Sequence, residues 1–409
     1  MPVGNVANPE TIYEIDGVRI GVTAAGVRYK NRNDLVVIEL AEKTSCAVVT
    51  TQSSFCAAPV QVLRKHIANY QPRYLLINTG NANAGTGREG IKRTQLTCES
   101  LAERLDESIS AQNILPFSTG VIGEPLNTDA LIAGLDAALA NLNVANWQVG
   151  ANAIRTTDTI AKLASEQVAV DGTTYHITGM SKGAGMIRPN MATMLGFIAT
   201  DANITQPLLQ QMLSSLTQQS FNRITVDGDT STNDCCVLLA TAKANTGVID
   251  SDRHPHYQAL YEALARVFLR LAQLIVRDGE GATKFISVNV CGGATQQECC
   301  DVAYAIAHSP LVKTACFASD PNWGRLLAAI GYAGVEGLDQ NNVSVSLNEV
   351  NICERGQIAE DYTEERGQAA MSRPEIVIKV DLARGDYEDT VYTCDLSYDY
   401  IKINADYRS

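Results

Sequence analysis

The sequence predicts a mixed α/β fold in which helices and sheets form layers. Short apolar runs rich in β-branched residues alternate with apolar stripes at helical spacing, which is the pattern of sheets covered by helices. The 409 residues allow two or three domains, or two large intertwined ones, and no low-complexity linker marks a flexible boundary. With 45% hydrophobic and 19% charged residues, the composition is that of a globular protein.

Strands are expected where apolar runs end at turn residues. Early in the chain these runs are Leu35–Leu40, Cys46–Thr51 and Tyr74–Ile77. The Asp171–Gly172 pair separates two alternating segments and predicts a hairpin that leads into a Gly-rich segment. Later strands are predicted at Phe285–Val290, Val343–Leu347, Glu375–Val380 and Thr390–Cys394.

Helices are expected where apolar residues recur every three or four positions. One such stripe runs from Cys98 to Leu105, and a second from Leu131 to Leu142 follows the capping candidates Asn127 and Thr128. Two further helices are predicted, at Thr205–Phe221, with Pro207 in its first turn, and from Tyr257 to Ile275. Two short helical patterns follow the strand at Phe285–Val290.

Charge and thiol content exclude several classes of protein. The net charge of −13 repels phosphate backbones, so we expect no nucleic-acid partner. No basic and apolar leader begins the chain, and the most apolar stretch, Tyr257–Val276, is interrupted by Arg266 and Arg270; we therefore expect no membrane partner and a cytoplasmic protein. The 11 cysteines suit reduced thiols, and the five histidines show no metal-binding spacing, so no metal is expected.

The densest motif is the segment Ser181–Leu195, SKGAGMIRPNMATML. Its glycines permit backbone angles closed to other residues, and Pro189 fixes one φ angle. Such a loop can hold the carbonyl of Ala192 against the hydroxyl of Thr193, whose attack would cut the chain. On these features alone, an ordinary turn before the apolar strand Met194–Ala199 is the commoner outcome.

The segment KGAGMIRPNMATML resembles the cleavage site of the ornithine acetyltransferase (glutamate N-acetyltransferase) family. Other motifs appear along the chain in that family's order: Gly21–Gly26, Asn78–Asn83, Ser118–Gly120, Thr156–Thr159, Asp227–Thr230, Glu280–Lys284, Asp320–Arg325 and Asn404–Ser409. Two small departures are Arg188, at a variable position, and Ala318–Ser319, where a Gly is usual.

The resemblance implies a layered helix/sheet sandwich of the DmpA/ArgJ type, cut into two intertwined chains. Residues 1–192 would form an α chain, and residues 193–409 a β chain with residues 285–409 as its C-terminal subdomain. It also implies a heterotetramer of two α and two β chains.

By the same resemblance, Thr193 is the nucleophile. Its α-amine, freed by cleavage at Ala192–Thr193, titrates near neutrality and can take the proton of its own hydroxyl. Thr119 and Gly120 match the pair that forms the oxyanion hole. Substrate binding falls to Thr193 and five further residues: Thr156, Lys182, Glu280, Asn404 and Ser409. For Lys182 and Glu280, the alternative is a solvated surface charge.

The reaction that the resemblance implies moves an acetyl group from N2-acetylornithine to L-glutamate, giving ornithine and N-acetylglutamate. No cofactor is expected, and whether acetyl-CoA serves as a second acetyl donor is left open by the sequence. Two other interpretations remain: an N-terminal-nucleophile aminopeptidase or amidase, and an uncleaved binding protein. Asp227–Asp234 and Asn78–Gly87 could suggest a divalent metal and a phosphate loop, but turns are favoured for both.

Overall fold

The computed structural model describes residues 2–188 and 194–406, and the chain within it divides into two compact units. The larger unit holds Ala7–Asn222 and Asp229–Ile275. The smaller unit holds Met1–Val6, Arg223–Gly228 and Val276–Ser409. The mixed α/β fold predicted from the sequence is confirmed, although both units are built from segments that are separated along the chain.

The larger unit contains two sheets. The first has the order β1-β2-β4-β5 and comprises β1 (Val18–Thr23), β2 (Leu35–Leu40), β4 (Tyr74–Asn81) and β5 (Ile114–Val121). The second has the order β3-β9-β8-β7-β6 and comprises β3 (Ser45–Thr50), β6 (Lys162–Val170), β7 (Thr173–Lys182), β8 (Leu195–Thr200) and β9 (Cys235–Ala240). The hairpin predicted at Asp171–Gly172 joins β6 to β7, with both turn residues at positive φ, as its tight turn requires.

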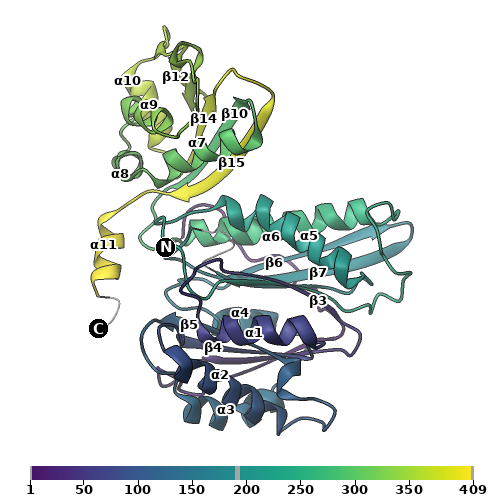
Figure 1. Ribbon diagram of the computed structural model, residues 1–409. Helices are drawn as coiled ribbons and strands as arrows, with labels where there is room; N and C mark the ends of the chain where they lie inside the picture. Colours follow the sequence, from purple (N-terminus) through teal and green to yellow (C-terminus); the bar gives the residue numbers. More distant parts are fainter. Residues whose placement is uncertain (1, 189–193, 407–409) are drawn as a thin grey trace. The chain divides into compact units, whose positions relative to one another are not determined.

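Helices cover the outer faces of both sheets, which gives the larger unit four layers (Figure 1). The first sheet is covered by α2 (Gly87–Ala102) and α3 (Thr128–Ala140), and the second by α5 (Gln206–Gln219) and α6 (Tyr257–Arg277). Two shorter helices, α1 (Ala58–Asn69) and α4 (Trp147–Ala153), add apolar side chains to the core between the sheets. Asn127 caps α3 as predicted, because its side chain accepts a hydrogen bond from the amide of Ala130.

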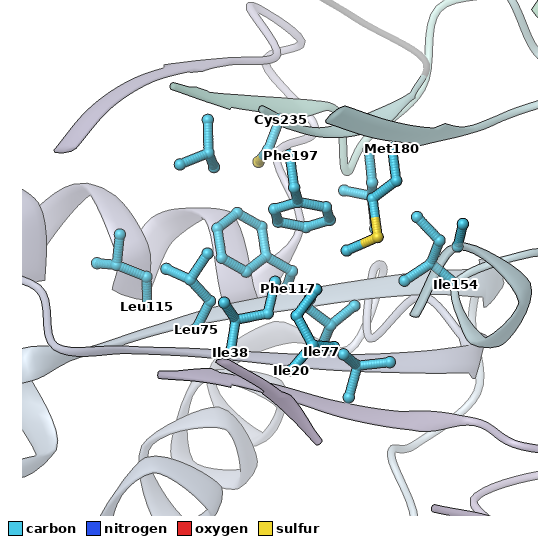
Figure 2. Packing of buried hydrophobic residues seen from close by; sticks show 14 of the residues in the cluster. Ile20, Ile38, Leu75, Ile77, Leu115, Phe117, Ile154, Met180, Phe197 and Cys235 are labelled. Atoms are coloured by element: carbon cyan, nitrogen blue, oxygen red, sulfur yellow. The ribbon is translucent and has the colours of Figure 1, made fainter. Parts of the chain in front are cut away.

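The facing sides of the two sheets enclose one hydrophobic core (Figure 2). Ile38, Leu75 and Phe117 come from the first sheet, and Met180 and Phe197 come from the second. The rings of Phe117 and Phe197 meet edge to face, with centroids 5.1 Å apart. This contact joins the two sheets through the middle of β5 and of β8.

The smaller unit is a six-stranded sheet with helices on one face. Its strand order is β13-β12-β11-β14-β10-β15, formed by β10 (Phe285–Gly293), β11 (Ser344–Leu347), β12 (Val350–Glu354), β13 (Gln357–Ile358), β14 (Glu375–Asp381) and β15 (Tyr387–Cys394). The helices on this face are α7 (Gln296–His308), α8 (Pro310–Ala318), α9 (Trp323–Gly331) and α10 (Glu364–Met371). Side chains alternate between buried and exposed along β14, so its other face is open. A final helix, α11 (Tyr398–Ala405), follows β15.

The two short helical patterns predicted after Phe285–Val290 are three helices, α7, α8 and α9, so that prediction was wrong by one. Ser309 ends α7, and its side chain caps α8 by accepting from the amide of Val312. Pro310 begins α8, because proline suits a first helical turn but not a helix interior. Among the described residues, no helix is long and apolar enough to cross a membrane.

Ser319, in the pair Ala318–Ser319 where the resembled family usually has a glycine, ends α8 in the left-handed conformation with φ of 54°. This conformation strains residues that carry a Cβ, and glycine adopts it freely. We expect Ser319→Gly to raise the free energy of unfolding by about 0.5–1 kcal/mol, since relief of strain exceeds the added freedom of the unfolded chain. Thermal or urea unfolding would measure this change. Ser319→Ala, which keeps the Cβ, is the control, and an equal gain in that variant would contradict the explanation.

Candidate active site

Thr119 and Gly120 lie near the C-terminal end of β5, beside β4. The strands are parallel, with Thr79 opposite Thr119 and Gly80 opposite Gly120. Gly120 has φ of 133°, and a Cβ there would lie 2.2 Å from the carbonyl carbon of Gly80. Only glycine fits this corner, because the backbone of Gly80 and Asn81 in β4 occupies the space where a Cβ would stand.

Lys182 is the last residue of β7, and its ammonium group donates a hydrogen bond to the hydroxyl of Thr119 at 3.1 Å. Two residues predicted from separate motifs are therefore in contact, although they belong to different sheets. Lys182 is partly buried, so the alternative of a solvated surface charge is wrong for this residue.

Asp158 connects several of the predicted site segments. One carboxylate oxygen, Oδ1, accepts from Lys162 Nζ at 2.6 Å and from the amide of Gly183 at 2.7 Å. The other, Oδ2, accepts from the amide of Thr156 at 3.0 Å. Burial alone would raise the pKa of Asp158, but the positive charges of Lys162 and Lys182 and these hydrogen bonds hold that pKa well below its usual range. The carboxylate is therefore ionised at neutral pH.

Ala192 and Thr193 lie outside the described residues. The strand β8, which follows them, begins at Leu195. The carbonyl of Met194 accepts a hydrogen bond from the amide of Cys235 at 3.0 Å. Leu195, the first residue of β8, lies opposite Lys182 on one side and Cys235 on the other. The chain therefore enters β8 between β7 and β9, with Leu195 directly beside the end of β7.

The acidic run Asp227–Asp234 includes a side chain that ties the site's strands together. Asn233 Nδ2 donates to the carbonyls of Ala82 and Ser118, at 2.6 and 2.9 Å. These two carbonyls follow β4 and precede Thr119, so the run contributes to the frame of the corner, as the turn interpretation expects. In the described part of the chain, no group of three His, Cys, Asp or Glu residues is arranged to hold a metal ion.

Glu280 and Asn404 meet in the smaller unit. Asn404 Nδ2 donates to Glu280 Oε2 at 2.8 Å, and Glu280 is only 8% exposed, so the surface-charge alternative is wrong for Glu280 too. Gly281 lets α11 approach, because a Cβ there would lie 2.4 Å from the amide of Tyr400. The Tyr400 hydroxyl in turn donates to Asp227 at 3.3 Å. Ser409 lies outside the described residues.

Sequence reasoning missed the roles of Asp158 and Asn233. Both stand inside motifs that were recognised, but their hydrogen bonds reach partners far away in the sequence. Asp158 and Lys162 are four residues apart, a spacing that normally suggests an ion pair on a helix. Here the pair stands at the entrance of β6. The sequence therefore showed only that the two residues carry opposite charges. It did not show that the pair is buried, and burial is what makes the pair important.

Comparison with known proteins gives matches over the whole chain. A protein from Psychrobacter arcticus, named arginine biosynthesis bifunctional protein ArgJ, is 68% identical over 409 residues, which are 100% of both chains. The ArgJ protein of Pseudomonas syringae pv. tomato is 52% identical over 398 residues, covering 97% of this chain and 98% of the relative. A crystal structure of argJ from Bacillus halodurans matches with a TM-score of 0.50 and 42% identity, covering 52% of this chain and 99% of that one.

The matches define an enzyme, an acetyltransferase of arginine biosynthesis. The chain belongs to the ArgJ family, whose model matches residues 19–409.

Proposed function

We propose that the enzyme transfers the acetyl group of N2-acetylornithine to L-glutamate through Thr193, after cutting its own chain between Ala192 and Thr193. In the first step the Thr193 hydroxyl attacks the Ala192 carbonyl, and the peptide bond is replaced by an ester. Breaking the peptide bond frees the α-amine of Thr193, and water then hydrolyses the ester, which regenerates the Thr193 hydroxyl and leaves a carboxylate on Ala192. That amine takes the proton of the Thr193 hydroxyl in each later attack.

The transfer itself has two halves. Thr193 takes the acetyl group from acetylornithine and ornithine leaves; glutamate then accepts the acetyl group and leaves as N-acetylglutamate. Each half passes through a tetrahedral intermediate whose oxyanion needs donors, and Thr119 and Gly120 are the proposed source. The restriction to glycine at position 120 supports this role, because it lets β5 pack directly against the β4 backbone and so holds the peptide groups of the corner in fixed positions.

One observation carries the proposal: the hydrogen bond between Lys182 and Thr119. It brings the end of β7, where the segment leading to Thr193 begins, to the proposed oxyanion corner. Each of the two residues already lies in a paired strand, so the hydrogen bond between them has no evident role in folding. A cation beside a hydroxyl, at a corner whose backbone is held by its neighbouring strand, suits a carboxylate substrate undergoing acyl transfer.

Self-cleavage has separate support from the Bacillus halodurans structure. Almost all of that solved chain matches about half of this one. Residues 193–409 also make up about half of the chain, so the solved chain has the length of one cleavage product.

The proposed recognition of the substrates follows from charge. Lys182 attracts a substrate carboxylate, and Glu280 attracts an ammonium group, while Thr156, Asn404 and Ser409 supply hydroxyl and amide groups that orient the bound amino acid. Asn404 already donates to Glu280, which holds that carboxylate in one orientation. A cytoplasmic heterotetramer of two α and two β chains completes the proposal.

The relatives are named bifunctional, which favours a second activity in this enzyme too. Acetyl-CoA is the proposed second acetyl donor to glutamate. Assays of acetyl-CoA with glutamate, run beside assays of acetylornithine with glutamate, separate one activity from two. Release of free acetate from acetylornithine without an acceptor would instead favour the aminopeptidase or amidase alternative.

Replacing the nucleophile tests cleavage. Thr193→Ala lacks the attacking oxygen, so we expect it to remain one full-length chain on denaturing electrophoresis and to be inactive. Thr193→Ser keeps the oxygen but loses the methyl group that restricts χ1, so slower cleavage and reduced activity are expected. Efficient cleavage of the purified Ala variant would rule out attack by this residue.

The acetyl intermediate should accumulate when acetylornithine is supplied without glutamate. Intact-mass spectrometry should then find one added acetyl group on the fragment 193–409, and peptide mapping should locate it on Thr193. Addition of glutamate should remove the label as N-acetylglutamate forms. A label on another residue, or none during verified turnover, would contradict transfer through Thr193.

Glu280→Gln keeps the shape of the side chain and an oxygen that can accept from Asn404, but removes the charge. We expect acetylornithine to bind more weakly by about 1.5–3 kcal/mol, the scale of a hydrogen bond to a charged group, with cleavage unchanged. Glu375→Gln is the matched control, because Glu375 is a paired carboxylate in the same unit, bound to Arg277. Equal losses in both variants would refute a specific role for Glu280.

A further inference from the structure

The buried pair of Asp158 and Lys162 has no place in the proposed chemistry. Both side chains are 0% exposed, and their charged atoms lie 2.6 Å apart. Burying two charges costs several kcal/mol per ion, by rough estimate, and a well-packed apolar pair is often at least as stable. Stability therefore does not explain why the pair at this position is charged. The explanation must come from the contacts that the pair makes.

Those contacts connect three parts of the site. Asp158 Oδ2 holds the amide of Thr156, and Oδ1 holds the amide of Gly183, the residue directly after Lys182. Lys182 in turn reaches Thr119. One carboxylate thus fixes the start of the segment that leads to Thr193, and through it the ammonium group at the oxyanion corner.

The carboxylate is suited to this task because both of its oxygens only accept hydrogen bonds. Lys162 Nζ and the Gly183 amide share one oxygen, while the Thr156 amide takes the other. An asparagine side chain has a single accepting oxygen, and its NH₂ group would face one of the donors. Substitution by asparagine therefore breaks at least one connection while leaving the volume almost unchanged.

We propose that Asp158 is a positioning residue, which holds the Lys182–Gly183 backbone and Thr156 in register with Thr119 for self-cleavage and acetyl transfer. Lys162 supplies the countercharge that lets the carboxylate stay buried. The inference rests on the proposed function of Thr193, but it adds a residue that touches neither the substrate nor the reacting atoms.

Three variants of the full chain test this role: Asp158→Asn, the double variant Asp158→Asn with Lys162→Met, and Asp201→Asn. The single variant leaves Lys162 without its countercharge and loses stability, whereas the double variant removes both charges and should regain it. Asp201→Asn is the matched control. Asp201 is also buried and binds the amide and ring of His176, near the opposite end of β7.

Cell-free synthesis with a pulse of labelled amino acid gives the cleavage rate, and thermal unfolding gives the melting temperature. Asp158→Asn should slow cleavage by about ten- to a hundredfold, the effect of one lost hydrogen bond to a charged group. The double variant should recover the melting temperature but not the cleavage rate. Asp201→Asn should lower the melting temperature and cleave at the parental rate.

The fraction of the double variant that does cleave provides a second measurement. Its KM for acetylornithine should rise by about tenfold, because Lys182 is no longer held in place. A folding defect alone would reduce the active fraction, and so the apparent kcat, and leave KM unchanged.

Parental cleavage and KM in the double variant would overturn the positioning role. The role would also be overturned if Asp201→Asn slowed cleavage as much as Asp158→Asn does. If the parental chain itself stays uncut, the proposed function of Thr193 fails, and this inference fails with it.

Discussion

The edge-to-face contact of Phe117 with Phe197 sets the spacing on which the larger unit's site depends. Side chains two residues apart on a strand point to the same face, so Phe117 and Thr119 both face the opposite sheet. Met180 and Lys182 have the same relation on β7, where Met180 lies opposite Phe197. The aromatic contact lies two residues before Thr119 on β5, so it fixes the distance between the sheets beside the site. At that distance the ammonium group of Lys182 reaches Thr119.

The site lies where the core ends, and this position explains its mixture of polarity. Inside, Phe117, Met180 and Phe197 exclude water (Figure 2). One step further along the strands, Thr119 and Lys182 are polar, and Asp158 is a charge without solvent contact. In such surroundings electrostatic interactions are stronger than in water, and a charge must be matched by fixed partners. The hydrogen bonds of Asp158 and Asn233 provide these partners.

Much of the fold could be predicted from the sequence, because the signals for its elements are local. Leu35–Leu40 is a strand with the predicted bounds, and the apolar stripe from Tyr257 identified the longest helix of the described chain. Several elements were not predicted, among them β1, α1, β5 and β9. The short strand β13 and the final helix α11 bury no residue, so neither has an apolar period to detect.

The site was less accessible to sequence reasoning. Family motifs located Thr119, Lys182, Glu280 and Asn404, but no periodicity predicts that Lys182 touches Thr119, 63 residues away. The division into two units was hidden for a related reason. Arg223–Gly228 and Val276–Ser409 belong to the smaller unit without any change of composition where the chain passes between units.

The order of strands in the five-stranded sheet has a consequence for the life of the protein after synthesis. β3, β6 and β7 precede position 193, while β8 and β9 follow it, and the two groups are paired through β3 with β9 and through β7 with β8. A cut at that position therefore divides one sheet between two polypeptides without removing any strand pair. It also changes the molecularity of folding, because a first-order process within one chain becomes an encounter between two. An uncut chain can fold at any dilution, whereas a chain cut there, once unfolded, would depend on its partner's concentration to return. Cleavage after folding would make assembly of this sheet a single, largely irreversible event.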